Sequence, residues 1–379
     1  MKKLLLASLM LGSVASYAQT ARKVMLEDFT GDWCQFCPNG TKGIEDILAT
    51  NPTNFLPVAV HCSNGDPLEI VDGVTLKNTL NVTGVPSGAI DRKIHSGQTK
   101  IPVGINGTAS QWKSIVPTRL AETAIASVSI TNKQKLANGS YSCDVNVKFT
   151  AMPTKAGVPI NVNLLILENG IAATGSLAQT NSTAHYGGGN PLTTADGYWH
   201  NNVLRQMVGG TWGFANVVPS PVVVGTVYKK TVTFTIPATG IPAAWDKSKI
   251  DIYAYVAYDG TVANDEKEIL NAEKATLTGF YPTGVNAITN DVQIMNAFPN
   301  PARSTDIINV EYNISKGEKV TMRVYNVTGQ VVAMPYDSEE VEGGHTILWR
   351  AADHSLPAGT YFMEVSSASG KHTQKIVIN

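Results

Sequence analysis

The chain has 379 residues, of which 43% are hydrophobic and 16% are charged. A chain of this length and composition is expected to fold into two or three globular domains. The formal net charge is -1, with 29 basic and 30 acidic residues, and no cluster of positive charge stands out. This balance excludes a nucleic-acid partner and a polybasic membrane patch. Abundant Val and Thr favour β-structure.

The N-terminus has the pattern of a secretory signal peptide. Lys2 and Lys3 precede an apolar run from Leu4 to Val14, and Ser16-Tyr17-Ala18 forms a small-x-small cleavage site. The apolar run is too short to span a bilayer, which takes about 20 helical residues. We therefore predict that residues 1–18 are removed on export. The mature chain is expected to have no transmembrane segment and to leave the reducing cytosol.

The segment 19–122 mixes strand and helix signals. Apolar runs of strand length alternate with a stretch that has helical spacing, which is typical of an α/β domain. The elements expected are strands at Lys23–Phe29, Phe55–Cys62 and Gly88–Asp91, with a helix over Thr41–Thr50.

The chemical lead is a Cys-x-x-Cys pair, Cys34 and Cys37, at the junction of the first strand and the helix. Pro38 is tolerated in a first helical turn but not in a helix interior, so the helix is predicted to start near Cys34. Unpaired amides and the macrodipole at a helix N-terminus stabilise a thiolate. Such a thiolate can attack a disulfide, and the second cysteine can resolve the mixed disulfide. Trp33 and Phe36 would give the pair an apolar contact surface.

Two other interpretations of the pair remain open at this point. It can be a permanent structural disulfide, or half of a zinc site, although only His61 and Cys62 are near enough in sequence to complete one. Cys62 and Cys143 are predicted to be buried core residues, with a bridge between them as the alternative. The chain has no G-x-S-x-G, H-E-x-x-H or P-loop motif, so no cofactor, metal or hydrolase chemistry is expected.

The W-C-Q-F-C sequence and the downstream Gly-Val-Pro resemble the corresponding motifs of the thioredoxin-like superfamily. The resemblance implies that Cys34 is the attacking thiol and Cys37 the resolving one. It also implies that Pro86 is a cis-proline facing the dithiol, with Val85 before it in contact with substrate. Asp28 would match the buried acidic residue that relays protons.

The segment 123–285 changes to short β-branched runs separated by turn residues, which predicts an antiparallel β-sandwich. A long insertion, 170–217, interrupts it. Its polar and aromatic residues can form a peptide-binding or glycan-binding cluster, or simply pack on the sandwich, and we favour packing. These residues are Trp199, His200, Asn201, Arg205 and Trp212.

Two longer stretches resemble one branch of the superfamily. EDFTGDWCQFCPNG and YWHNNVLRQMVGGTWG are similar to the E-x-F-T-G-x-W-C-x-x-C-P and H-N-x-V-L-R signatures of the 28-kilodalton outer-membrane-protein-related family. The resemblance spans roughly Val24 to Leu277. Surface binding or adhesion has been proposed for that family.

The segment 286–379 is predicted to form a small separate β-sandwich. Four blocks resemble the type A C-terminal sorting domain of the type IX (Por) secretion system: AFPNPARSTDIINVEY, VYNVTGQVV, LPAGTYFMEV and the terminal QKIVIN. The resemblance implies that the type IX secretion machinery recognises this domain and that the domain is usually cleaved.

We therefore expect an α+β multidomain protein. It would comprise a thioredoxin-like α/β domain, an antiparallel β-sandwich and a C-terminal β-sandwich sorting domain. We expect it to be secreted or attached to the outer membrane or cell surface. The leading hypothesis is thiol–disulfide exchange with protein substrates through Cys34 and Cys37. The alternative is a non-catalytic surface binding or adhesion protein in which the pair is a structural disulfide.

Overall fold

The computed structural model describes residues 21–105, 109–240, 244–261, 267–282, 292–314, 317–368 and 370–379. The predicted signal peptide lies outside these residues, as does the predicted boundary at 285/286. The chain divides into two compact units, Met1–Pro282 and Thr283–Asn379. Each unit is described by itself below.

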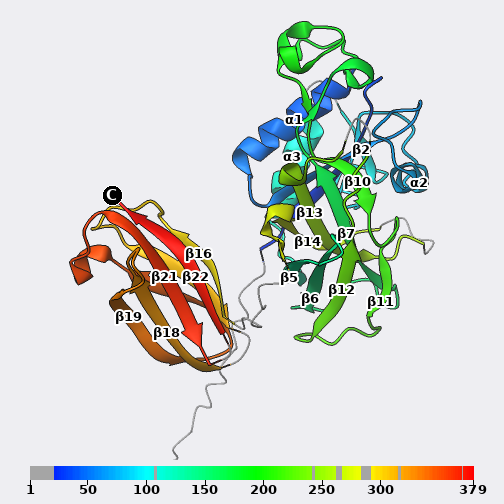
Figure 1. Ribbon diagram of the computed structural model, residues 1–379. Coiled ribbons are helices and arrows are strands. Elements are labelled where there is room, and N and C mark those ends of the chain that lie inside the picture. Colours follow the sequence, from blue (N-terminus) through cyan, green and yellow to red (C-terminus); the bar gives the residue numbers. More distant parts are fainter. Residues whose placement is uncertain are drawn as a thin grey trace, which may run out of the picture. The chain divides into compact units, whose positions relative to one another are not determined.

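The first part of the larger unit is a mixed sheet covered by helices on both faces (Figure 1). Its elements are β1 (Val24–Thr30), α1 (Cys37–Thr50), β2 (Phe55–His61), α2 (Val71–Thr79), β3 (Ser87–Ile90), β4 (Pro102–Gly104) and α3 (Ser110–Leu120). Strand β1 pairs in parallel with β2 and antiparallel with β3, which pairs antiparallel with β4. The strands and the helix expected in this segment are therefore present.

Strand β1 is buried along its whole length because both of its faces are covered. Leu26 packs in one cluster with Ile44 of α1 and Trp112 of α3. Met25 and Phe29 point to the opposite face and join a second cluster with α2. This alternation follows from the period of two in a strand. The same alternation places Asp28 on the face of the sheet that α1 covers.

The second part of the larger unit is built from strands. They are β5 (Ala126–Lys135), β6 (Tyr141–Phe149), β7 (Ile160–Glu168), β8 (Ile171–Ala172), β9 (Trp199–His200), β10 (Val203–Met207), β11 (Phe214–Val218), β12 (Val227–Phe234), β13 (Ile250–Tyr258), β14 (Ile269–Thr276) and β15 (Tyr281–Pro282). One sheet has the order β12-β6-β5-β15. It encloses a core with the facing residues of β7 and β13, so two sheets pack as a sandwich.

The two parts share a single sheet. Its strand order is β14-β13-β7-β10-β2-β1-β3-β4, with β11 also paired to β7. The joining strand, β10, comes from the predicted insertion 170–217 and pairs in parallel with β2 and antiparallel with β7. The insertion is therefore more than a loop on the surface. Strand β7 is buried on both faces, because Leu164 points into the sandwich core and Leu165 into the cluster beneath α2.

The smaller unit is a sandwich of two antiparallel sheets. Its strands are β16 (Val292–Phe298), β17 (Ile308–Ile314), β18 (Glu318–Tyr325), β19 (Val331–Glu340), β20 (Gly343–Trp349), β21 (Gly359–Ser367) and β22 (Gly370–Ile378). The sheet orders are β16-β17-β20 and β19-β18-β21-β22. Inward-facing residues such as Val310, Met322 and Met363 form its core. Among the described residues, no helix has the length and hydrophobicity needed to cross a membrane.

Candidate functional site

Cys34 and Cys37 form a disulfide in the connection between β1 and α1. The helix begins at Cys37 with Phe36 as its N-cap, so the expected start near Cys34 is wrong. The reason is that Cys34 lies in a separate turn. Its N–H donates to the Gly31 carbonyl (3.1 Å), and its own carbonyl accepts from the Cys37 N–H (3.2 Å). Pro38 occupies the first helical turn, where its missing N–H costs nothing.

The two sulfur-bearing residues differ in exposure. Cys34 is 4% exposed, whereas Cys37 is fully buried. The side chains of Trp33 (36% exposed) and Phe36 (52% exposed) stand on the surface beside them. An incoming thiol can therefore reach only Cys34, across an apolar rim.

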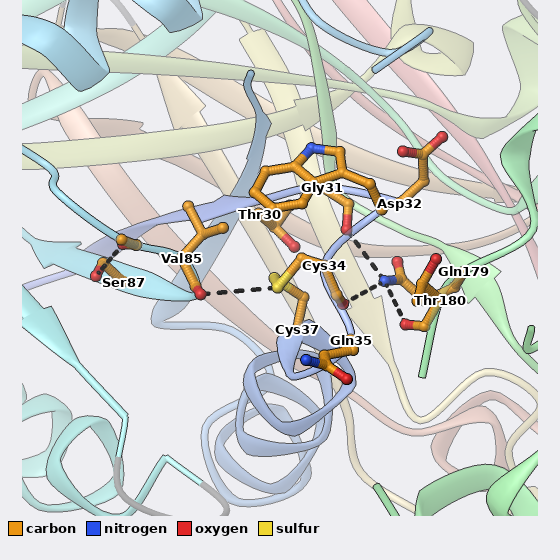
Figure 2. The surroundings of a disulfide bond; sticks show 12 residues. Thr30, Gly31, Asp32, Cys34, Gln35, Cys37, Val85, Ser87, Gln179 and Thr180 are labelled. Atoms are coloured by element: carbon orange, nitrogen blue, oxygen red, sulfur yellow. Dashed lines mark hydrogen bonds between the residues drawn. A yellow bond between two sulfur atoms is a disulfide. The ribbon is translucent and has the colours of Figure 1, made fainter. Parts of the chain in front are cut away.

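The loop before β3 lies opposite the disulfide (Figure 2). The Val85–Pro86 peptide bond is cis, and the Val85 carbonyl oxygen lies 3.7 Å from Cys34 Sγ. In the disulfide the sulfur carries no hydrogen, so this is a contact; the thiol of the reduced form can donate to the same oxygen. A Cβ atom at Gly40 of α1 would lie 3.3 Å from Pro86 Cβ. A residue without a side chain thus allows the helix to approach this loop closely.

A cleft of about 430 Å³ opens beside the same loop. Its walls include Phe36 from the disulfide loop, Val85 and Pro86 from the opposite loop, and Lys100 and Ile105. The walls are mixed, because Asn39, Thr83, Ser87 and Lys100 add polar side chains to the apolar ones. The cleft is therefore large enough for a few side chains of a polypeptide placed next to Cys34.

Asp28 of β1 is buried beneath α1. Its Oδ2 would lie 3.4 Å from a Cβ at Gly40, about one turn after Cys37, and its Oδ1 has no hydrogen-bond partner among the described residues. Burial raises the pKa of Asp28 to about 8. This carboxyl group therefore exchanges its proton near neutral pH.

The other two cysteines are free and buried, as predicted. Cys62 lies in the cluster beneath α2, and Cys143 of β6 lies in the sandwich core, so no bridge joins them. Burial raises the pKa of Cys62 to about 11 and that of Cys143 to about 12. Both thiols are unreactive at neutral pH.

A buried polar cluster behind the disulfide loop was not foreseen from the sequence. Asp66 Oδ2 accepts a hydrogen bond from the Asp32 N–H (2.9 Å) and lies 2.7 Å from His61 Nδ1. The His61 ring meets the His200 ring edge-on at 5.3 Å. Burial raises the pKa of Asp32 to about 6 and lowers that of His200 to about 4. The spacing of His61 and Asp66 around a strand end is the signal that could have revealed their pairing.

Of the polar and aromatic residues singled out in the insertion, Trp199 and Asn201 are exposed, whereas His200 and Arg205 are buried. His200 is buried and donates through Nε2 to the Leu177 carbonyl (2.8 Å). Arg205 is also buried, with its guanidinium over the Trp245 ring at 4.7 Å. These side chains support the packing interpretation. Among the described residues, no group of three or more His, Cys, Asp or Glu side chains is arranged to hold a metal ion.

Comparison with known families gives two matches. Residues 74–277 match the family model of outer membrane protein Omp28, and residues 296–379 match the secretion system C-terminal sorting domain. No curated protein matches the sequence.

Comparison with solved structures finds HBP35 of Porphyromonas gingivalis, at 19% identity and a TM-score of 0.50, covering 96% of this chain and 100% of that one. This likeness concerns the fold alone. A protein of Agrobacterium tumefaciens matches at 16% identity and a TM-score of 0.37, covering 68% of this chain and 96% of that one.

Proposed function

Because the chain belongs to the outer membrane protein Omp28 family and ends in a secretion-system sorting domain, we propose that it is an extracytoplasmic thiol–disulfide exchange protein that acts through Cys34 and Cys37. The sorting domain directs export by the type IX system, through contact with that machinery. The protein is thus secreted, or held at the outer membrane or cell surface. Disulfides form and persist in such oxidising compartments, so protein substrates with disulfides would be present there.

The observation that carries the proposal is the position of the disulfide. It joins the turn after β1 to the first turn of α1, with Cys34 opposite the Val85 carbonyl and a cleft lined by Phe36 and Val85 beside it. The order β2-β1-β3-β4, with α1 following β1, supports the resemblance to the thioredoxin-like fold. In this proposal Trp33, Phe36 and Val85 contact the substrate.

The exchange follows from the difference in exposure between the two cysteines. A thiolate of a substrate dithiol attacks Cys34 Sγ, which forms a mixed disulfide and expels Cys37 as a thiolate. The second substrate thiolate then attacks the substrate sulfur of that bond and releases Cys34. The substrate loses two electrons and two protons and becomes a disulfide, while the protein gains both and becomes a dithiol. The reverse sequence reduces a substrate disulfide.

Asp28 is proposed to take part in the proton transfers. Cys37 needs a proton when it leaves and must lose one when it resolves the mixed disulfide. A buried carboxyl group with a pKa of about 8, near the first turn of α1, can accept and return that proton at neutral pH.

The test combines insulin reduction by dithiothreitol with thiol titration of the purified protein. We expect the wild type to accelerate insulin reduction, and Cys34→Ser to return the rate to the uncatalysed value. Alkylation of reduced Cys37→Ser by iodoacetamide should show a thiol titrating below about 8.5, the pKa of a free cysteine. Cys143→Ala is the matched control, since it removes a buried thiol of the sandwich core, and its rate should equal that of the wild type.

One observation favours the alternative, a surface binding protein with a structural disulfide: only 4% of Cys34 is exposed. The same experiment separates the two. If the wild type does not accelerate insulin reduction and no thiol titrates below that of a free cysteine, the exchange proposal fails. In that case, loss of the disulfide in Cys34→Ser should lower only the stability of the protein.

A further inference from the structure

The insertion lies over the disulfide loop. Between β8 and β9 it forms short 3-10 turns, at Gly175–Leu177, His185–Gly188 and Thr194–Asp196, and this segment is the green loop next to α1 in Figure 1. Gln179 follows the first of these turns and exchanges two backbone hydrogen bonds with Leu192 (2.9 and 2.7 Å). That bridge fixes the position of Gln179, whose side chain is 1% exposed.

The Gln179 side chain is hydrogen-bonded on both sides of its amide. Its Nε2 donates to the carbonyl oxygens of Cys34 (2.9 Å) and Gly31 (3.0 Å), and shares a further contact with the Thr180 carbonyl (3.1 Å), as Figure 2 shows. Its Oε1 accepts from the Tyr198 hydroxyl (3.3 Å). An amide is the side chain that can donate two hydrogens and accept one in this way.

The backbone of the insertion extends these contacts along the loop. The Thr180 N–H donates to the Asp32 carbonyl (2.7 Å), and the Ser182 N–H donates to the Gln35 carbonyl (2.9 Å). With the two bonds from Gln179, the carbonyls of four loop residues accept hydrogen bonds from the insertion. These residues are Gly31, Asp32, Cys34 and Gln35. The insertion thus fixes the loop and offsets the partial negative charge of its carbonyl oxygens.

From these contacts we propose that Gln179 is a positioning residue that sets the reactivity of Cys34, an inference that rests on the exchange function proposed above. When the disulfide is reduced, the loop loses its covalent link to Cys37, and Cys34 acquires negative charge as a thiolate. The hydrogen bonds from Gln179 to the carbonyls of Cys34 and Gly31 then keep the backbone of the loop in place, and with it the Cys34 sulfur. They also weaken the repulsion between the thiolate and the carbonyl dipoles, which favours the thiolate.

The test compares two substitutions at the same position. Gln179→Met keeps the approximate volume and removes every side-chain hydrogen bond, whereas Gln179→Glu keeps the shape and the acceptor for Tyr198 but loses the amide donor. The iodoacetamide alkylation profile of Cys34 is measured in the Cys37→Ser background, where the buried thiols of Cys62 and Cys143 do not interfere. The equilibrium of the Cys34–Cys37 pair with glutathione is measured in the otherwise unmodified chain.

We expect Gln179→Met to raise the midpoint of the alkylation profile by about one pH unit, because the amide no longer offsets the carbonyl dipoles nearest the thiolate. Gln179→Glu should raise it further, because the carboxylate adds negative charge. Both variants should make the protein severalfold harder to reduce by glutathione. Thr174→Ala, an exposed position of the same insertion, is the control and should behave as the wild type.

The outcomes separate this inference from the proposed function. If the wild type exchanges with glutathione and both Gln179 variants keep its alkylation profile and equilibrium while only their melting temperatures fall, Gln179 is merely structural. If the wild type itself fails to exchange, the proposed function is wrong. Should Gln179→Met not fold, the profile of Gln179→Glu decides.

Discussion

At the scale of single residues, the raised pKa of Asp28 leads to a prediction about the stability of the protein. Its pKa in the folded protein is about 8 because it is buried, against an ordinary value of 3.8. Between these values the folded state keeps a proton that the unfolded state has lost, so the free energy of unfolding falls as the pH rises from about 4 to about 8. The contribution of one such group is at most about 1.4 kcal/mol per pH unit.

Replacing Asp28 by Asn should therefore flatten the pH dependence. The amide has nearly the same shape and does not titrate, so the variant should gain stability relative to wild type as the pH rises toward 8. Urea unfolding of both proteins at pH 5, 6.5 and 8 measures this difference. Parallel curves for wild type and Asp28→Asn would mean that the carboxyl group does not titrate in this range.

At the scale of elements, two distant blocks of the sorting domain are joined edge to edge. The side chain of Asn300 donates to the Lys375 carbonyl (2.8 Å) and accepts from the Val377 N–H (2.9 Å). Ala302 continues the pairing along the outer edge of β22 with bonds to Val377 and Asn379. The amide of Asn300 thus pairs with the strand as a neighbouring backbone would, which protects an otherwise open edge.

Asn300→Ala should loosen this edge. Losing two side-chain hydrogen bonds at this exposed site is expected to cost about 1 kcal/mol of the stability of the smaller unit. Hydrogen exchange at the Val377 amide should speed up more than exchange in β18. Asn313→Ala, an exposed asparagine of β17, is the control, and it should leave both measurements unchanged. Equal protection of Val377 in wild type and Asn300→Ala would contradict this role.

At the scale of the molecule, buried charges tie the first part of the larger unit to the second. Arg119 of α3 binds Asp91 (2.8 Å) and, across the predicted boundary at 122/123, Glu268 (2.6 Å). Arg92 binds Glu27 (2.8 Å) and the hydroxyl of Tyr255 on β13 (3.2 Å). Removing one partner of such a buried pair typically costs about 3–5 kcal/mol.

The fragment 19–122 should consequently not fold by itself. Truncation would take β10 from the edge of β2, expose the apolar cluster beneath α2 and leave Arg119 without Glu268. We expect circular dichroism and proton NMR to show an unfolded or aggregated fragment, while the fragment 19–282 unfolds in one cooperative step. A dispersed NMR spectrum and cooperative melting of 19–122 would show instead that it is an independent domain.

Local patterns in the sequence were sufficient to predict the features that depend on neighbouring residues. The Cys-x-x-Cys spacing places two sulfurs within bonding reach, and Pro38 after it indicates a helix start, although it located that start three residues too early. Alternating apolar residues predicted most strands, and the terminal blocks identified the sorting domain, because each of these signals is local in the chain.

Which distant segments meet is visible only in the folded chain. Nothing in the local pattern of 170–217 shows that Val203–Met207 joins two halves of one sheet, or that Gln179 donates to the carbonyl of Cys34, 145 residues away. Asn300 likewise has no signal for its pairing with β22. The backbone bonds among these contacts are open to any residue other than proline, and the amide bonds to any Asn or Gln, so their partners are selected by the packing of the whole chain.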